Sequence, residues 1–208
     1  MNRAWIGRRG LLGGAAGLLV TRPLSARAAA AASAKPRVTV TTNKGVFVLE
    51  LEAEKAPITA TNFLRYVDAG KYDGGVIYRA SRIPGVKGAG SIQGQPAVKA
   101  RRFRPIEHES TIKTGLKHRA GTISMGRSTP GSATADFFIC ASPQPYLDAN
   151  PKAKGDNLGF AAFGSVVQGM DVVKKILALP TPGKTYVPEM KGQILDPPVQ
   201  ILSMKRTA

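Results

Sequence analysis

The chain has 208 residues, of which 43% are hydrophobic and 21% charged, a composition that excludes a wholly disordered protein and allows one domain with a sizeable core. Its single cysteine excludes an intramolecular disulfide and a cysteine-rich zinc module, and with only two histidines a histidine-based metal site would need carboxylates. The net charge of +17 makes nucleic acid or an acidic surface the first partner to consider.

The first 28 residues have the pattern of a twin-arginine export signal. The pair Arg8-Arg9 precedes a ten-residue apolar run at 11–20, about half of what a membrane-spanning helix needs, and Ala26-Arg27-Ala28 is a small-x-small cleavage pattern. We expect cleavage, a periplasmic location and no membrane insertion afterwards. The alternative is a short anchor that stays attached. Removing residues 1–28 leaves a net charge of +12.

A short leader at residues 29–36 then precedes a single domain at 37–206. Two β-rich runs around Asn43-Lys44-Gly45 predict a hairpin over residues 37–52. The hydrophobic period then becomes helical over 56–69, with Pro57 in the first turn. A second helix is predicted over 170–179, where Pro180 stops it.

Between and after these helices lie short apolar runs separated by glycine, proline and polar turns. With the hairpin they predict about eight strands, at 75–79, 91–95, 121–126, 136–141, 160–167 and 199–204 besides the first two. Because the two helices do not alternate with the strands, a doubly wound parallel sheet is disfavoured. A mainly β fold, an antiparallel barrel or sandwich, is favoured.

Common catalytic and metal-binding motifs are missing. The segment around Ser124 lacks the first glycine of a nucleophile elbow, and there is no phosphate-binding loop. His108 lies between two glutamates, but neighbouring strand residues face opposite ways, so we expect no shared metal. His118 and Asp136 could form a base and its orienting carboxylate. Since no nucleophile is marked beside them, we interpret both histidines as polar surface or loop residues and expect no metal or cofactor.

The densest basic cluster, Lys99–Arg104, contains one aromatic residue and no repeat. A nucleic-acid platform needs interleaved aromatic and basic residues, so a solvated basic loop is the favoured interpretation. Export away from nucleic acid supports the same interpretation, and no nucleic-acid partner is expected.

Eight segments between residues 37 and 206 carry motifs in a fixed order: the Asn43-Lys44-Gly45 hairpin, Ala56–Phe63, Tyr72–Arg79, Ser91–Gly94, Ala120–Met125, Ala135–Ile139, Tyr146–Asp148 and Phe163–Val173. Together they resemble the motifs of the cyclophilins, the barrel-fold peptidyl-prolyl cis-trans isomerases. The resemblance implies a closed eight-stranded antiparallel barrel capped by two α-helices.

The resemblance also implies a site for X-Pro peptides. Arg79 is expected to donate to the prolyl nitrogen of the twisted amide, and Gln93 to bind the substrate backbone and orient Arg79. Phe138, Met125 and Leu147 are expected to line the proline pocket.

Further contacts are implied at positions where the chain departs from the family pattern. Tyr146 replaces the family's indole, Phe160 a frequent histidine, and Gly126 the alanine after Ser-Met. Gly90-Ser91 replace Phe-Met, and the loop 81–89 is longer than usual, so we expect Ile83 or Val86 to refill that wall.

The function expected from this resemblance is isomerisation of X-Pro bonds during folding of exported proteins, by a monomer whose partners are proline-containing polypeptides. An alternative is a proline-segment binding module or chaperone with little turnover. A third hypothesis, adhesion of the basic surface to nucleic acid or anionic envelope polymers, depends on charge alone.

Overall fold

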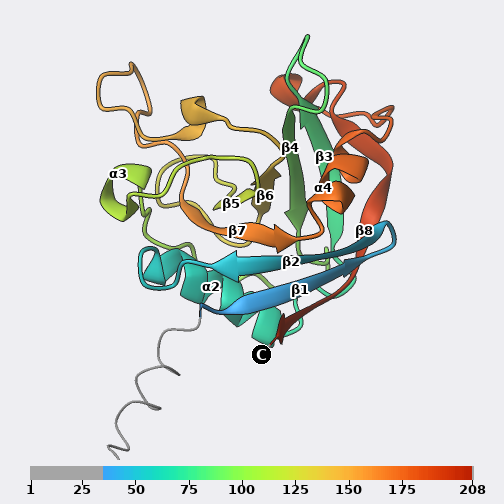
Figure 1. Cartoon of the computed structure of the whole chain (residues 1–208), viewed down its shortest axis with the longest axis horizontal. Coiled ribbons are helices and arrows are strands. Elements are labelled where there is room, and N and C mark those ends of the chain that lie inside the picture. The colour runs from blue at the N-terminus through green and yellow to red at the C-terminus, as the bar shows by residue number, and fades with distance from the viewer. Residues whose placement is uncertain (1–34, 208) are drawn as a thin grey trace, which may run out of the picture. The chain divides into compact units, whose positions relative to one another are not determined.

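The computed structural model describes residues 35–207, and the predicted signal peptide and most of the leader lie outside this range. Eight strands form a closed antiparallel barrel in the order β1-β2-β7-β5-β6-β4-β3-β8 (Figure 1). The expectation of a mainly β, eight-stranded barrel is confirmed. The strands are β1 Arg37–Thr42, β2 Gly45–Leu51, β3 Val76–Arg82, β4 Gly90–Gln95, β5 Thr122–Met125, β6 Phe137–Cys140, β7 Ala162–Gln168 and β8 Ile194–Thr207.

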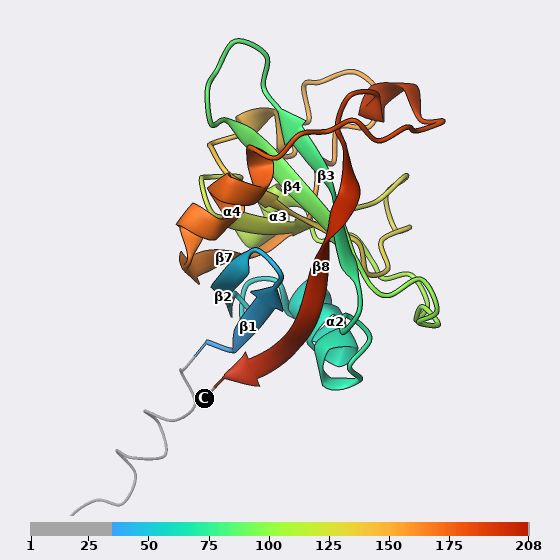
Figure 2. The same cartoon turned by 90° about the vertical axis from the view of Figure 1, so that its right-hand side faces the viewer.

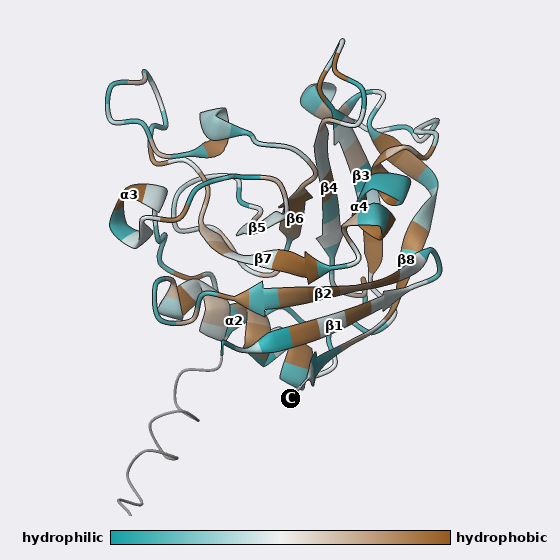
Figure 3. Ribbon diagram, viewed as in Figure 1, coloured by the Kyte–Doolittle hydropathy of each residue, from teal (hydrophilic) through white to brown (hydrophobic). Residues whose placement is uncertain are grey.

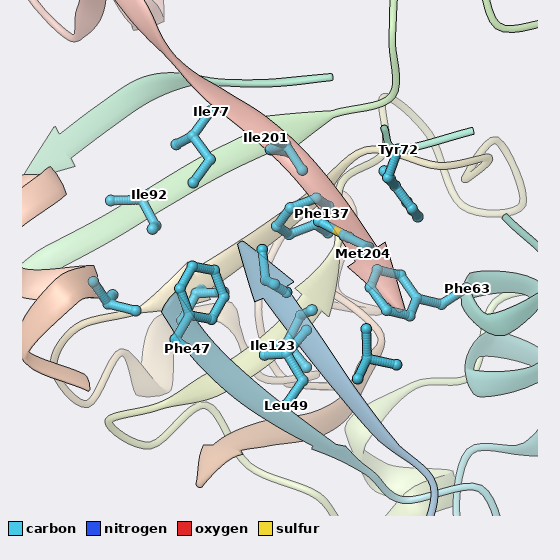
Figure 4. Close-up of a cluster of buried hydrophobic side chains, with 14 of the residues drawn as sticks. Phe47, Leu49, Phe63, Tyr72, Ile77, Ile92, Ile123, Phe137, Ile201 and Met204 are labelled. Carbon is cyan, nitrogen blue, oxygen red and sulfur yellow. The ribbon is translucent and has the colours of Figure 1, made fainter. Parts of the chain in front are cut away.

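The core fills the inside of the barrel, because alternate side chains of each strand point inward. Phe47 and Leu49 of β2 are fully buried, while Val48 between them is partly exposed. Figure 4 shows inward-pointing side chains from several strands meeting at the centre, together with Phe63 of a helix. Hydrophobic valines alternate with less hydrophobic residues along β1 in Figure 3, as this period requires, whereas β2 is mostly hydrophobic.

Two helices pack against different parts of the barrel, and both add residues to its core. They are α2, Pro57–Asp68, beside β7 and β8, and α4, Met170–Leu177, beside β2, β3 and β4 (Figure 2). A one-turn helix, α3 (Thr111–Thr114), and two 3-10 turns at Pro145–Leu147 and Pro188–Met190 were not predicted. No helix within residues 35–207 is both long and apolar enough to cross a bilayer.

The last strand begins five residues earlier than its apolar run predicts. Ile194 of β8 already pairs with Arg79 of β3, and Val199 pairs with Ile77 after a register shift. Pro197-Pro198 lie between these pairings, where the ladder is interrupted and no backbone N–H is needed. The prolines therefore interrupt the strand without ending it.

Glu109 closes the N-terminus of α2 from a distant part of the chain. Its side chain, buried with only 1% exposed, accepts hydrogen bonds from the backbone N–H groups of Ile58 and Thr59, at 3.2 and 2.7 Å, and from the Thr59 hydroxyl at 2.7 Å. The N-cap residue, Ala56, has no side chain that could do this. A carboxylate at this end also complements the helix dipole. Glu109 thus serves the helix and not a metal with His108.

Removing the Glu109 carboxylate, the clamp at the start of α2, should lower stability markedly. We expect Glu109→Ala to reduce the free energy of unfolding by about 2–4 kcal/mol, since a hydrogen bond to a charged group contributes about 1.5–3 kcal/mol and three donors lose their acceptor. Urea unfolding measures the change. The exposed Glu107→Ala serves as the control, and equal midpoints for the two variants would contradict the clamp.

Candidate active site

The strand register places the predicted catalytic residues in one row across the barrel wall. Arg79 of β3 pairs with Gln93 of β4, Gln93 pairs with Phe138 of β6, and Phe138 pairs with Ser124 of β5. The neighbouring row is fully buried in the core and consists of Ala80, Ile92, Ile139 and Ile123. One row therefore contains the predicted site residues, and the next row packs in the core.

A β-bulge lets Arg79 join the outer row. Ile77 and Ala80 are both fully buried although they are three residues apart, which a regular strand does not allow. The register shifts between Ile77 and Arg79, so one extra residue, Tyr78, is accommodated there. Bulges commonly re-aim side chains in this way. The bulge turns Arg79 away from the core while keeping Ala80 within it.

The row opens onto a cleft of about 260 Å³. The structure brings eight of the ten predicted site residues to this cleft, namely Arg79, Gln93, Phe138, Gly126, Leu147, Tyr146, Phe160 and Ser91. Phe138 is 7% exposed and so is both a wall of the cleft and part of the packed interior, whereas Tyr146 is 69% exposed at its rim. Apolar rings beside a guanidinium form a setting suited to a proline ring and its amide.

Two predicted contacts lie elsewhere. Met125, 1% exposed, belongs to the core cluster and does not line the cleft, because it precedes Gly126 and side chains alternate along the strand. Gly90 is buried at the end of β4, where its carbonyl accepts a hydrogen bond from the Gln144 side chain at 2.7 Å. A Cβ there would lie 2.0 Å from the Ser81 carbonyl oxygen, which explains the glycine.

The expectation that Ile83 or Val86 refills the wall is wrong. The loop 83–89 turns to the opposite side of the hairpin, where Ile83 and Val86 face Leu177 and Ala178 of the α4 end across a separate hollow of about 590 Å³. That hollow, although larger, contains none of the Arg79 row. Met190 supplies apolar surface to the cleft instead.

Arg79 is held by two side-chain amides. Its Nε donates to Gln193 Oε1 at 2.8 Å and its Nη1 donates to Gln93 Oε1 at 3.0 Å. Three of its five N–H groups have no side-chain amide acceptor among the described residues. Partial burial lowers the pKa of the Arg79 guanidinium, yet an arginine stays protonated in proteins. The structure thus presents a fixed positive donor at the cleft.

Several cleft residues were not singled out from the sequence. Gln193 and Met190 lie more than 100 residues from Arg79 along the chain, and Arg127 and Gln144 lie near recognised motifs but carry no motif of their own. The Arg127 guanidinium, 5.0 Å from the Phe160 ring centroid, pairs with Asp156 at 2.5 Å and donates to the Gly159 carbonyl. It ties the loop before β7 to the cleft.

His118 is not a surface residue as predicted. It is 2% exposed, and its Nδ1 lies 2.7 Å from Asp148 Oδ1 while its Nε2 lies 3.0 Å from Ser124 Oγ. This geometry resembles a Ser-His-Asp triad, but Ser124 is completely buried, so no substrate reaches its hydroxyl. The partner of His118 is Asp148 and not Asp136, which pairs with Arg102.

Instead, the His118 ring supports Phe138. The two rings stack with centroids 5.9 Å apart and planes 12° from parallel. Phe160 meets the Phe138 ring edge-on at 5.3 Å. The Phe138 ring is therefore held between a hydrogen-bonded imidazole and a second aromatic ring, which restricts the rotation of its side chain.

The basic cluster 99–104 is partly used within the fold. Phe103 packs edge-on against Tyr66 at 4.7 Å, with the Arg65 guanidinium 4.1 Å from its ring centroid. Arg102 forms its ion pair at 2.7 Å. Across residues 35–207, no group of three or more histidine, cysteine or acidic side chains is arranged to hold a metal ion.

Comparisons with known proteins identify the family of this chain. The family model for "Cyclophilin type peptidyl-prolyl cis-trans isomerase/CLD" matches residues 37–206, so the chain belongs to the cyclophilin family. The peptidyl-prolyl cis-trans isomerase of Acinetobacter baylyi is 36% identical over 79% of this chain and 81% of its own length. Isomerase A of Dickeya dadantii is 38% identical over 68% of this chain and 70% of its own length.

Solved structures show the same fold. A cyclophilin-type isomerase of Cryptosporidium parvum superposes with a TM-score of 0.61 at 21% identity, covering 84% of this chain and 98% of that one. The same protein has been crystallised in the presence of the dipeptide Ala-Pro, with a TM-score of 0.60, 21% identity, and coverage of 83% and 99%. By family, the chain is a peptidyl-prolyl cis-trans isomerase.

The buried imidazole should make stability depend on pH. Burial lowers the pKa of His118 from 6.5, although Asp148 acts in the opposite direction. Below about pH 6.5 His118 is protonated in the unfolded chain but remains neutral in the folded chain. The free energy of unfolding therefore falls as the pH falls. Urea unfolding between pH 8 and 5 should show this slope in the natural protein, and His118→Asn should flatten it. His108→Asn should keep it, and an unchanged slope in His118→Asn would contradict this origin.

Proposed function

We propose that this chain accelerates rotation about X-Pro bonds while exported proteins fold, acting as a monomer in the periplasm. The observation that carries the proposal is the fixed Arg79 guanidinium in the same cleft as the buried Phe138 ring. The export part is supported by Arg8-Arg9 and Ala26-Arg27-Ala28, which lie outside the described residues.

The reaction requires no covalent intermediate. Rotation about an X-Pro amide breaks C–N resonance, with a barrier of about 18–20 kcal/mol. Twisting pyramidalises the prolyl nitrogen and localises a lone pair on it. A catalyst must favour this twisted form over the planar one. Phe138 and Leu147 would hold the proline ring, and an N–H of Arg79 would donate to the lone pair.

Gln93 would contribute through its position between Arg79 and Phe138. Its carbonyl oxygen accepts from Arg79, so its NH₂ group remains to donate to a substrate carbonyl. That contact would fix the peptide backbone relative to the guanidinium. The substrate class we propose is therefore a proline-containing polypeptide, recognised through the proline ring and the adjoining backbone.

Removing the guanidinium should separate chemistry from packing. We expect Arg79→Ala to fold, to bind X-Pro peptides, and to lose on the order of 10²–10³ in kcat/KM, the range measured when one positioned donor is removed from other enzymes. A protease-coupled assay measures the rate. Phe138→Ala should lower both activity and stability, the latter by about 3–5 kcal/mol, because its ring is buried.

Three outcomes distinguish the candidate functions. If Arg79→Ala isomerises peptides as fast as the natural protein, Arg79 has no catalytic role. If the natural protein binds proline peptides without accelerating their rotation, the binding module with little turnover replaces the enzyme. Salt-sensitive binding to a polyanion without any dependence on proline would favour adhesion by the basic surface.

The export proposal has its own test. We expect the exported protein to begin after Ala28, because small residues flank Arg27 at the predicted cleavage site. N-terminal sequencing of the periplasmic fraction measures this. Lysine at both Arg8 and Arg9 should reduce export by the folded-protein route. Recovery of intact Met1 in the membrane fraction would instead indicate a retained anchor.

A further inference from the structure

The connection between α4 and β8, residues 178–193, forms a closed loop beside the cleft. Two hydrogen bonds join its beginning to its end: the Gly183 N–H donates to the Ile194 carbonyl at 3.0 Å, and the Thr181 hydroxyl donates to the Gly192 carbonyl at 2.8 Å. At its start, Arg82 of β3 donates to the Leu177 carbonyl at 2.9 Å. The two ends of the connection are thereby fixed to each other and to the β3–β4 hairpin, which keeps its side chains in register with the cleft.

Gln193 stands at the end of this connection, directly beside Arg79. Its Nε2 donates to the Glu189 carbonyl at 3.0 Å, and its backbone carbonyl accepts from the Ala80 N–H at 2.9 Å. Because the NH₂ end of the amide is engaged, its oxygen is the end that faces the Arg79 Nε, at 2.8 Å. The guanidinium is held from two sides, by Gln93 and Gln193, and both acceptors are neutral. It is therefore oriented by hydrogen bonds to two amides, and it stays protonated whichever acceptor holds it.

Met190 lies in the same connection and lines the cleft. It is half-buried, in the 3-10 turn Pro188–Met190, whose last residue is fixed because the Gln193 N–H donates to the Met190 carbonyl at 3.0 Å. On β4, the cleft-lining residue next to Gln93 on the same face is the small polar Ser91. The unbranched thioether side chain of methionine is apolar and adaptable, so it can contact apolar side chains of different shapes.

We propose that the 178–193 connection is a working wall of the site, in which Gln193 positions Arg79 and Met190 contacts the substrate side chain next to proline. This inference depends on the proposed X-Pro isomerisation. Gln193 acts through Arg79, so its removal lowers turnover more than binding. Met190 acts on the substrate directly, so its removal changes which neighbours of proline are preferred.

The positioning role is tested by Gln193→Met, which has a similar length but no acceptor oxygen, and by Gln193→Glu, which keeps one. We expect about tenfold lower kcat with little change in KM for Gln193→Met, since an ordinary hydrogen bond contributes about 0.5–1.5 kcal/mol, and recovery of much of that loss for Gln193→Glu. Gln200→Ala, on the exposed side of β8, is the matched control. Thermal unfolding checks that each variant folds, and Gln193→Ala replaces any that does not.

The substrate contact is tested by Met190→Ala on peptides in which the residue before or after proline is leucine, alanine or glutamate. We expect the preference for leucine over glutamate to fall about tenfold at one of the two positions, because lost methylene contacts in a binding pocket change specificity by about 10–200-fold. Leu202→Ala, exposed on β8, controls for a general loss of apolar surface.

The outcomes separate this inference from the proposed function. If the natural protein isomerises none of these peptides, the proposed function fails. If the natural protein is active and Gln193→Met matches it in both kcat and KM, the positioning role is overturned. If Met190→Ala keeps the natural order of substrates, the contact is overturned. Equal losses in Gln193→Met and Gln193→Glu would also contradict orientation through the amide oxygen.

Discussion

The register between β3, β4, β6 and β5 is the constraint on which the site depends. It places Arg79, Gln93 and Phe138 in one row and puts the row of Ile92 and Ile139 one step away, inside the barrel. Because strand side chains alternate, a slip of one residue would carry the charged row into the core and the isoleucines onto the cleft. Core packing and site geometry are therefore enforced by the same hydrogen-bonded ladder, with the bulge before Arg79 as its one local adjustment in β3.

The sequence predicts the local secondary structure and the residues that belong to motifs. It misses the side chains whose partners lie far away along the chain. The hairpin, both longer helices and most strands follow from periodicity and turn residues, and eight of the residues named from the motifs lie at one cleft. Met125 lies in the core instead, because a motif does not say which face of a strand a residue occupies. Gln193 was missed because nothing near it in the sequence marks a partner 114 positions away.

The two histidine regions show the same limit. Glu109 looks like half of a metal site in sequence, yet its carboxylate closes α2, 50 residues upstream. His118 looks like a loop residue, yet Asp148 and Ser124 hold it inside the protein behind Phe138. In both cases the local pattern was read correctly as polar, but only tertiary pairing decides whether such a group is solvated or buried.

Several arginines have structural uses, so their presence does not by itself require a polyanionic partner. Arg82 donates to carbonyls at the end of α4, Arg127 fastens the loop that carries Phe160, and Arg102 pairs with Asp136. An arginine offers several donors in a fixed plane, so it can join backbone carbonyls from two segments at once.

Some residues of the site lie on paired strands, and others lie on a connection between elements. Arg79, Gln93 and Phe138 sit on paired strands whose register the core enforces, while Met190 sits on a connection. Connections tolerate insertion and replacement far better than paired strands do. Over evolutionary time, a lineage could therefore vary the part of this connection around Met190 and change its substrate preference, while Gln193 and the strand residues keep Arg79 in place.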